Sequence, residues 1–70
     1  MDQAAQFVTC QQTFTALMNV PVITTKVTPQ VLEQWQDEFR EASELNAEGD
    51  YAGAVAACND LVAAISAALA

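Results

Sequence analysis

Residues 42–65 read ASELNAEGDYAGAVAACNDLVAAI, and this stretch decides how the chain folds. Gly49 and Asp50 separate two runs of residues that have helical periodicity. Glycine is favoured just after the C-terminus of a helix, and aspartate is a good N-cap for the helix that follows. A turn this short makes the two helices antiparallel neighbours. The sequence therefore predicts a helical hairpin, with helices over residues 29–47 and 51–69.

The apolar residues on both sides of the turn recur at steps of three and four, which is the spacing of one helical face. Thr28 and Pro29 favour a helix start. The threonine side chain can accept a hydrogen bond from a free backbone amide, and proline lacks a backbone N–H group that has no partner in the first turn. The face before the turn consists of Leu32, Trp35, Phe39, Ala42 and Leu45. The face after it is a heptad-like seam of Tyr51, Val55, Cys58, Val62, Ile65 and Leu69.

The segment before the hairpin predicts one more helix and a connection. Asp2 is a candidate N-cap for a helix over residues 3–18. Its apolar stripe is formed by Phe7, Cys10, Phe14 and Leu17. Residues 19–28 are rich in β-branched side chains, which favour extended backbone. We therefore expect an extended crossover that lays Val20, Val22, Ile23 and Val27 over the helix ends.

Together these elements predict an all-α fold in a single domain over residues 1–70. It is a three-helix bundle built on the antiparallel hairpin, with the extended crossover after its first helix. With 70 residues the core is small, and domains of this size often gain stability from a staple or a partner.

Charge and composition exclude several classes of function. The chain carries 2 basic and 9 acidic side chains and no histidine, for a formal charge of −7. Direct binding to nucleic acid needs a basic patch, which this composition does not supply. Histidine, a glycine-rich phosphate loop and zinc-ligand spacing of cysteines are all absent from the sequence. We therefore expect a protein that is not an enzyme and has no cofactor or metal site.

The predicted helix over residues 29–47 carries an acidic stripe. Like charges at this spacing destabilise a helix by about 0.2–0.5 kcal/mol per pair. A helix that keeps this unfavourable spacing of like charges along its whole length suggests that the carboxylates have a function, such as docking a basic surface. The alternative is a solvated face that keeps a small alanine-rich protein soluble. The stripe consists of Glu33, Asp37, Glu41, Glu44 and Glu48.

The helix over residues 51–69 is apolar or alanine nearly all round, which indicates a second buried face. A partner helix or a second copy could dock there. The alternative is that the first helix and the crossover cover it. The helix is also long enough to span a membrane, but Asn59 and Asp60 near its middle make this costly, and we expect no span. The predicted apolar seam for a partner consists of Trp35, Phe39, Val55, Leu61, Val62, Ile65 and Leu69.

Cys10 and Cys58 are predicted to lie at the same level of two parallel helices, both facing inward. We expect two small buried thiols that pack in the core, because disulfides are rare in a reducing cytosol, and a disulfide is the alternative. Two cysteines are too few for a secreted disulfide framework, and no signal peptide is visible. We therefore expect a cytoplasmic protein.

The turn of the hairpin resembles that of a tetratricopeptide repeat. That family has a small residue and a large apolar one before a Gly-Asp-Tyr-x-x-Ala motif. The resemblance covers about 20 residues and implies binding of a protein or peptide. Cys58 stands where the family usually has a bulky aromatic residue. The residues that carry the resemblance are Ala42, Leu45, Gly49, Asp50, Tyr51, Ala54 and Leu61.

These features predict a small protein–protein interaction module, such as an adaptor, an assembly chaperone or a regulatory subunit. The apolar seam would hold a partner helix and the acidic stripe would steer a basic partner. One alternative is an acidic inhibitor that occupies the basic nucleic-acid-binding site of a target protein. Another is a structural protein that assembles with itself as a homo-oligomer.

Overall fold

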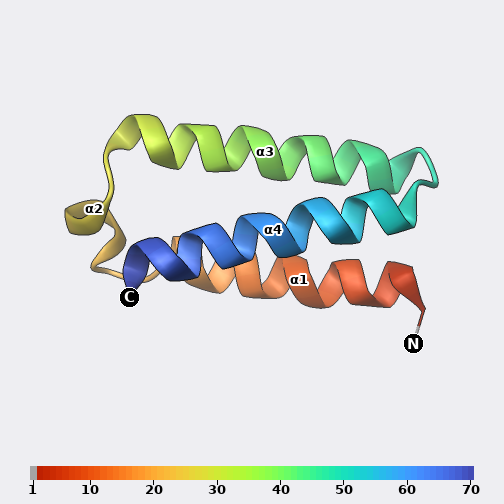
Figure 1. Cartoon of the computed structure of the whole chain (residues 1–70), viewed down its shortest axis with the longest axis horizontal. Coiled ribbons are helices and arrows are strands. Elements are labelled where there is room, and N and C mark those ends of the chain that lie inside the picture. Colours follow the sequence, from red (N-terminus) through yellow and green to blue (C-terminus); the bar gives the residue numbers. More distant parts are fainter. Residues whose placement is uncertain (1) are drawn as a thin grey trace.

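The computed structural model describes residues 2–70, which form an all-α fold of four helices (Figure 1). Three helices are long: α1 spans Gln3–Met18, α3 spans Pro29–Ala47 and α4 spans Tyr51–Leu69. The fourth, α2, is a single turn over Ile23–Lys26. The bounds of the long helices coincide with residues 3–18, 29–47 and 51–69.

The three long helices begin at residues whose side chains satisfy free backbone donors. Asp2 accepts a hydrogen bond from the amide of Ala4, and Thr28 accepts one from Val31. The carboxylate of Asp50 accepts from the amide of Gly53 at 3.1 Å. Each bond pairs one of the amides that a helix start leaves without an intrahelical partner.

The turn between α3 and α4 depends on the backbone freedom of Gly49. This residue has a φ of +91°, a conformation that side chains with a Cβ rarely adopt. The amide of Asp50 then donates to the carbonyl of Leu45 at 2.9 Å, which closes the C-terminal end of α3. The chain reverses within this turn, and α4 runs back along α3 (Figure 1).

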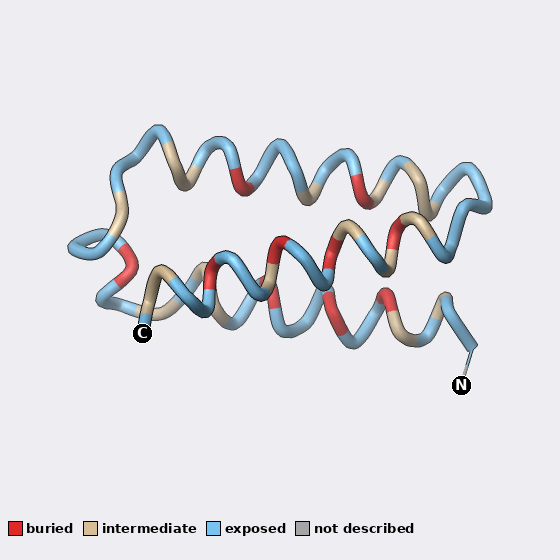
Figure 2. Tube along the Cα trace, in the orientation of Figure 1, coloured by how far each residue is buried: buried red, intermediate tan, exposed pale blue. Residues whose placement is uncertain are grey.

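α4 packs along α1 on one side and along α3 on the other. Figure 1 shows α4 running parallel to α1 and antiparallel to α3. The rings of Phe7 and Phe14 from α1 both stack on Phe39 of α3, and so bridge the two helices. Figure 2 shows the buried residues on the facing sides of the long helices. The buried core consists of Phe7, Cys10, Phe14, Ile23, Trp35, Ala42, Ala54, Cys58, Leu61 and Ile65.

The expectation of an extended crossover over residues 19–28 is wrong, because α2 lies inside it. Extended backbone pairs its amides and carbonyls with water or with a neighbouring strand, and among residues 2–70 there is no strand. A helical turn pairs these groups locally, as the amide of Ile23 does with the carbonyl of Val20. The hydroxyl of Thr25 adds a bond of 2.7 Å to the carbonyl of Val22. Local hydrogen bonds therefore outweigh the β-branched preference.

The crossover side chains cover the helix ends only in part. Ile23 is buried, and Val20 and Val27 are half-buried. Val22 is 46% exposed, contrary to expectation. The ammonium group of Lys26 donates to the carbonyl of Ala70 at 3.4 Å, so α2 lies beside the end of α4.

Candidate interaction surface

Charge in this molecule is gathered on one side. α1 carries no acidic or basic side chain, and Asp60 is the one charged residue of α4. The remaining charged side chains outside α3 are Asp2, Lys26, Glu48 and Asp50, and Glu48 directly follows the end of α3. α3 holds the rest, so the surface over α1 and most of α4 is neutral while the surface over α3 is strongly acidic.

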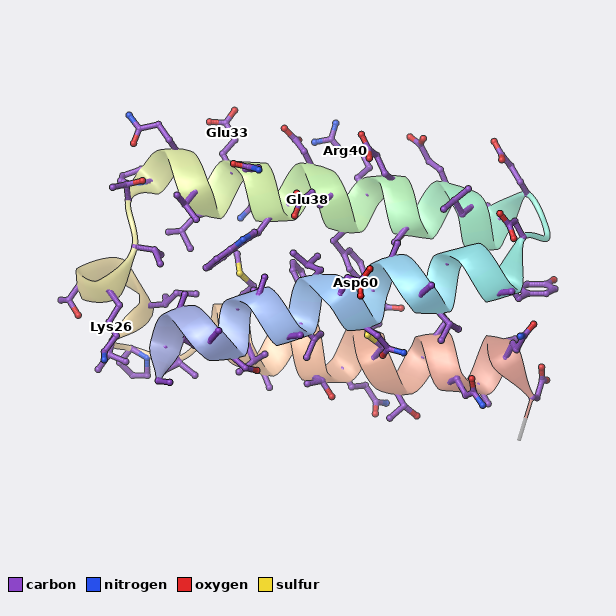
Figure 3. The ribbon with its side chains drawn as sticks, in the orientation of Figure 1. Lys26, Glu33, Glu38, Arg40 and Asp60 are labelled. Atoms are coloured by element: carbon purple, nitrogen blue, oxygen red, sulfur yellow. A yellow bond between two sulfur atoms is a disulfide. The ribbon has the colours of Figure 1, made fainter. Side chains whose placement is uncertain are left out.

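The five residues of the predicted acidic stripe are all exposed; four lie on α3, and Glu48 is the residue at its C-terminal cap. Within residues 2–70 the one ion pair joins Arg40 to Asp37, a neighbour on the same helix. This pair is largely exposed to water and therefore adds little stability. Figure 3 shows Glu33 and Arg40 on the outer side of α3, away from α4. The other carboxylates of the stripe face solvent without a cation beside them in the described chain.

A groove between α3 and α4, which we call the acidic groove, combines carboxylates with an apolar floor. Its volume is about 300 Å³. Its rim carries Glu38 and Glu41 from α3 and Asp60 from α4, all exposed. Figure 3 shows Glu38 and Asp60 on neighbouring sides of the two helices. The floor consists of Ala42, Leu45, Ala57 and Leu61.

The acidic groove exists because alanine occupies two facing positions in the hairpin. Ala42 and Ala57 carry only a methyl group each, so the surface between α3 and α4 stays hollow above Leu61. Lys and Arg side chains bury their aliphatic stems on apolar surface and keep the charged head near anions. The floor and rim of this groove suit such a side chain, and neutral or acidic groups would leave the rim carboxylates unpaired.

The residues of the predicted apolar seam lie inside the fold. Trp35 is 7% exposed, Leu61 is 4% exposed and Ile65 is fully buried. The others, Phe39, Val55, Val62 and Leu69, are half-buried and pack against the same core. α1 supplies Phe7 and Phe14 to this core, so the first helix covers the seam. A partner helix could reach the buried members Trp35, Leu61 and Ile65 only if the helices around them moved apart.

Large exposed apolar side chains are few and scattered. Val8, Val22 and Tyr51 are the ones in the described chain, and they come from α1, the crossover and the start of α4. Isolated apolar residues of this kind are normal on soluble proteins. Among residues 2–70 there is also no group of three potential metal ligands. The acidic groove is therefore the surface feature with the most distinct chemistry.

By length and composition α4 is a helix that could cross a membrane. The same two properties are found in core helices of soluble proteins. Here α4 lies between α1 and α3, contributes Ala54, Cys58, Leu61 and Ile65 to the core, and carries Asp60.

Sequence reasoning located the stripe but missed the groove. In the sequence, Glu38 lies outside the predicted stripe, and Asp60 argues only against membrane insertion. The available signal was the position of Asp60 relative to the turn, because Asp60 and Glu38 lie equally far from Gly49 along the chain. Folding the hairpin about that turn brings position 60 opposite positions 38 and 41.

The structure also shows that Cys10 and Cys58 are joined by a disulfide, with their Cα atoms 6.3 Å apart. The bond links α1 to α4 at the same level, as the parallel arrangement of these helices predicts. The expectation of two packed thiols is therefore wrong, and the alternative, a disulfide, is what the structure has.

No protein-family model, no curated protein and no solved structure matches this chain.

Proposed function

We propose that this chain is a small acidic protein–protein interaction module that binds a basic helical segment of a partner in the acidic groove. The observation that supports this most is the meeting of Glu38, Glu41 and Asp60 around an apolar floor. The proposal treats the three long helices as one three-helix bundle, with the α3–α4 hairpin as its binding unit.

Binding would combine two contributions. A Lys or Arg stem would cover Leu45 and Ala57, and its cation would meet the rim carboxylates at Glu38 and Asp60. The exposed stripe on the outer side of α3 would attract the partner from a distance and raise its association rate. The predicted seam contributes as the core that holds the two walls of the groove in place.

The proposed role is binding without catalysis, so no residue is assigned as an acid, base or nucleophile and no cofactor is invoked. We also propose that α4 is not a membrane span. Insertion would place Asp60 in hydrocarbon at a cost of several kcal/mol and would separate α4 from both neighbouring helices.

Location is a separate proposal, and the disulfide bears on it. Disulfides persist in oxidising compartments and are rare in the cytosol. The cytoplasm expected from the sequence would hold Cys10 and Cys58 as thiols, and the bonded form would belong to an oxidising compartment. Alkylation of free thiols in freshly lysed cells, followed by mass measurement, distinguishes the two.

The test uses a labelled basic amphipathic peptide of lysine and leucine, with a glutamate-for-lysine peptide as its control. Fluorescence anisotropy should show binding of the basic peptide and none of the acidic one. The groove variant Glu38→Lys with Asp60→Lys should lose this binding. The control variant Glu33→Lys with Glu48→Lys has the same net charge and leaves the groove intact, so it should keep most of the affinity. Equal losses in both variants would contradict a groove site.

The exposed stripe gives specific support to a second candidate, an inhibitor that occupies a basic nucleic-acid-binding site. In that case the five stripe carboxylates would carry the affinity. The Glu33→Lys and Glu48→Lys variant would then bind less well than the groove variant, which reverses the order expected above.

Self-assembly remains a third proposal, because the neutral surface over α1 and α4 would not repel a second copy. Sedimentation equilibrium over a hundredfold range of concentration tests it. A constant monomer mass would remove this candidate, and a dimer whose mass is unchanged by the Glu38 and Asp60 variants would favour it.

A further inference from the structure

A second hollow lies between α1 and α4, away from the acidic groove. Its volume is about 290 Å³. Cys10 lines it and Cys58 does not. The two sulfur-bearing residues also differ in exposure, since Cys10 is 5% exposed and Cys58 is fully buried. Of the two halves of the disulfide, Cys10 is therefore the one that borders this hollow, and Cys58 lies behind it in the core.

We propose that this hollow is a site of thiol–disulfide exchange, at which small thiols attack the sulfur of Cys10. This inference is independent of the acidic groove and of any partner that binds there. It assigns a different role to each cysteine: Cys10 receives the incoming thiol, and Cys58 is the sulfur that is released.

The exchange balances as an ordinary displacement at sulfur. The incoming thiolate forms a new S–S bond with Sγ of Cys10, and the bond between Cys10 and Cys58 breaks. Its electron pair leaves on Sγ of Cys58, which then takes a proton from water. A second thiolate can attack the mixed disulfide, release Cys10 as a thiol and leave with the first as a small disulfide. Two external thiols are then oxidised and the protein disulfide is reduced.

The walls of the hollow favour this chemistry because they carry no charge. The polar side chains that line it are Gln6, Thr9, Thr13 and Asn59, and the rest of the wall is Cys10 with two valines. No carboxylate in this wall repels an incoming thiolate. The rate of exchange depends on which sulfur can be reached, and here only Cys10 borders the hollow.

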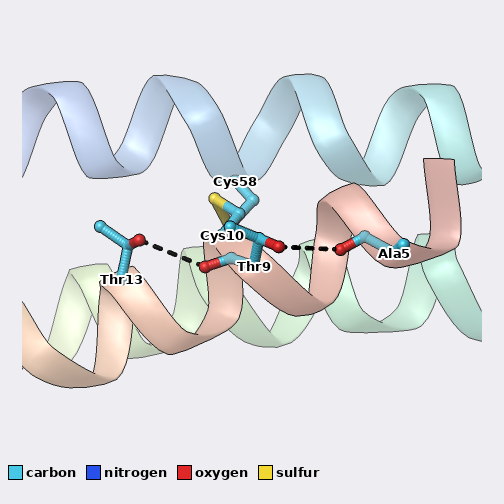
Figure 4. The surroundings of a disulfide bond; sticks show 5 residues. All are labelled: Ala5, Thr9, Cys10, Thr13 and Cys58. Carbon is cyan, nitrogen blue, oxygen red and sulfur yellow. Dashed lines mark hydrogen bonds between the residues drawn. A yellow bond between two sulfur atoms is a disulfide. The ribbon is translucent and has the colours of Figure 1, made fainter. Parts of the chain in front are cut away.

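The threonine hydroxyls beside the disulfide are already occupied. That of Thr9 donates to the carbonyl of Ala5 at 3.1 Å, and that of Thr13 donates to the carbonyl of Thr9 at 3.2 Å (Figure 4). These bonds lie within α1 and fix both side chains. Neither hydroxyl is held across the hollow to α4, so no side-chain bond from these residues closes the opening.

The chain offers a direct way to identify the attacked sulfur. Its basic residues, Lys26 and Arg40, both lie between the two cysteines, so trypsin releases Cys10 in residues 1–26 and Cys58 in residues 41–70. The oxidised full-length chain is treated briefly with glutathione under native conditions and then quenched by denaturation in excess N-ethylmaleimide, which also reaches the buried Cys58. The digest is then analysed by mass spectrometry without reduction.

We expect glutathione on the peptide with Cys10 and N-ethylmaleimide on the peptide with Cys58. Glutathione on the Cys58 peptide would overturn the proposal. An equal division between the peptides would also overturn it, because it would mean that exchange takes place in unfolded chains, in which both sulfurs are accessible.

A matched pair of variants tests the hollow itself. Thr13→Phe places a ring in the hollow, whereas Thr15→Phe places the same ring at an exposed position that does not line it. We expect Thr13→Phe to slow formation of the mixed disulfide about tenfold, equal to about 1.4 kcal/mol in activation free energy. Thr15→Phe should leave the rate unchanged. Equal rates in the two folded variants would contradict access through the hollow, and the peptide mapping of the unmodified chain stands if either variant does not fold.

Discussion

The ring of Phe39 on α3 stacks on the ring of Phe14 on α1, with centroids 4.4 Å apart and planes only 8° from parallel. Phe7 stacks on the same ring of Phe39 at 5.9 Å. Aromatic pairs of this kind are worth about 0.5–1.5 kcal/mol beyond their buried area. α1 and α3 are thus joined by aromatic side chains. Phe39 packs against the core cluster around Phe7 and against the cluster around Phe14.

Replacement of Phe39 by alanine should therefore detach α1 from α3 and lower the free energy of unfolding by about 3 kcal/mol, the lower end for buried phenylalanine. The lower end applies because Phe39 is only half-buried. Urea denaturation followed by far-UV circular dichroism measures this, with the disulfide intact. Val8→Ala, at a position that is 51% exposed, is the control and should change stability by less than about 0.5 kcal/mol. Equal effects of the two changes would contradict the bridging role of Phe39.

The disulfide should be a major source of stability. It closes a loop between residues 48 apart, for which the loss of unfolded-state entropy corresponds to about 4 kcal/mol. The double variant Cys10→Ala with Cys58→Ala should lose about this amount, and reduction of the natural chain should have a similar effect. Thermal unfolding with and without a phosphine reductant measures both. The variant provides the control, since a reductant should not shift its midpoint, and an unchanged midpoint in the reduced natural chain would refute the estimate.

Asp50 and Gly53 should be energetically coupled at the start of α4. A methyl group on Gly53 would lie 2.5 Å from Oδ2 of Asp50, so it would displace the carboxylate that caps the helix. Asp50→Ala should cost about 1 kcal/mol. Gly53→Ala alone should give almost no gain, although alanine is favoured over glycine in helices by about 1 kcal/mol. In the Asp50→Ala variant, Gly53→Ala should raise the free energy of unfolding by the full amount of about 1 kcal/mol, because no carboxylate is displaced.

A double-mutant cycle in urea gives the coupling between these two positions directly. Two additive effects would show that the cap tolerates the methyl group, and they would contradict the contact inferred here.

Reversal of one charge at the end of α3 should stabilise the protein. Glu48 lies four residues after Glu44 and at the negative end of the helix dipole. Glu48→Lys would create an attractive pair with Glu44 and should raise the free energy of unfolding by about 0.5–1 kcal/mol at low salt. The gain should shrink in 1 M salt because the charges are exposed. Glu48→Gln is the control and should give about half the gain, whereas a loss of stability on charge reversal would refute the interpretation.

The sequence predicts well those elements whose conformation depends on residues close together in the sequence. Asp2, Thr28 and Asp50 cap helices as their residue types favour, and Gly49 adopts the conformation that its lack of a side chain allows. Periodicity located the stripes that face the core. The all-α fold therefore follows from local rules.

The features that escaped prediction depend on contacts between distant segments. Residues 23–26 form a helical turn with local hydrogen bonds, which β-branched composition alone does not reveal. The acidic groove needs Asp60 and Glu38 to meet across the hairpin. Whether Trp35 and Ile65 faced a partner or α1 was likewise a question of packing, and the fold places them in its core.

The gathering of acidic groups over α3, with a neutral surface over α1, makes the whole molecule an electric dipole. A molecule with such a separation of charge rotates in the field of a cationic object before the two touch. It would arrive with α3 and the acidic groove turned toward that object and with the disulfide on the opposite, neutral side. Most encounters with a cationic object would therefore begin in one orientation.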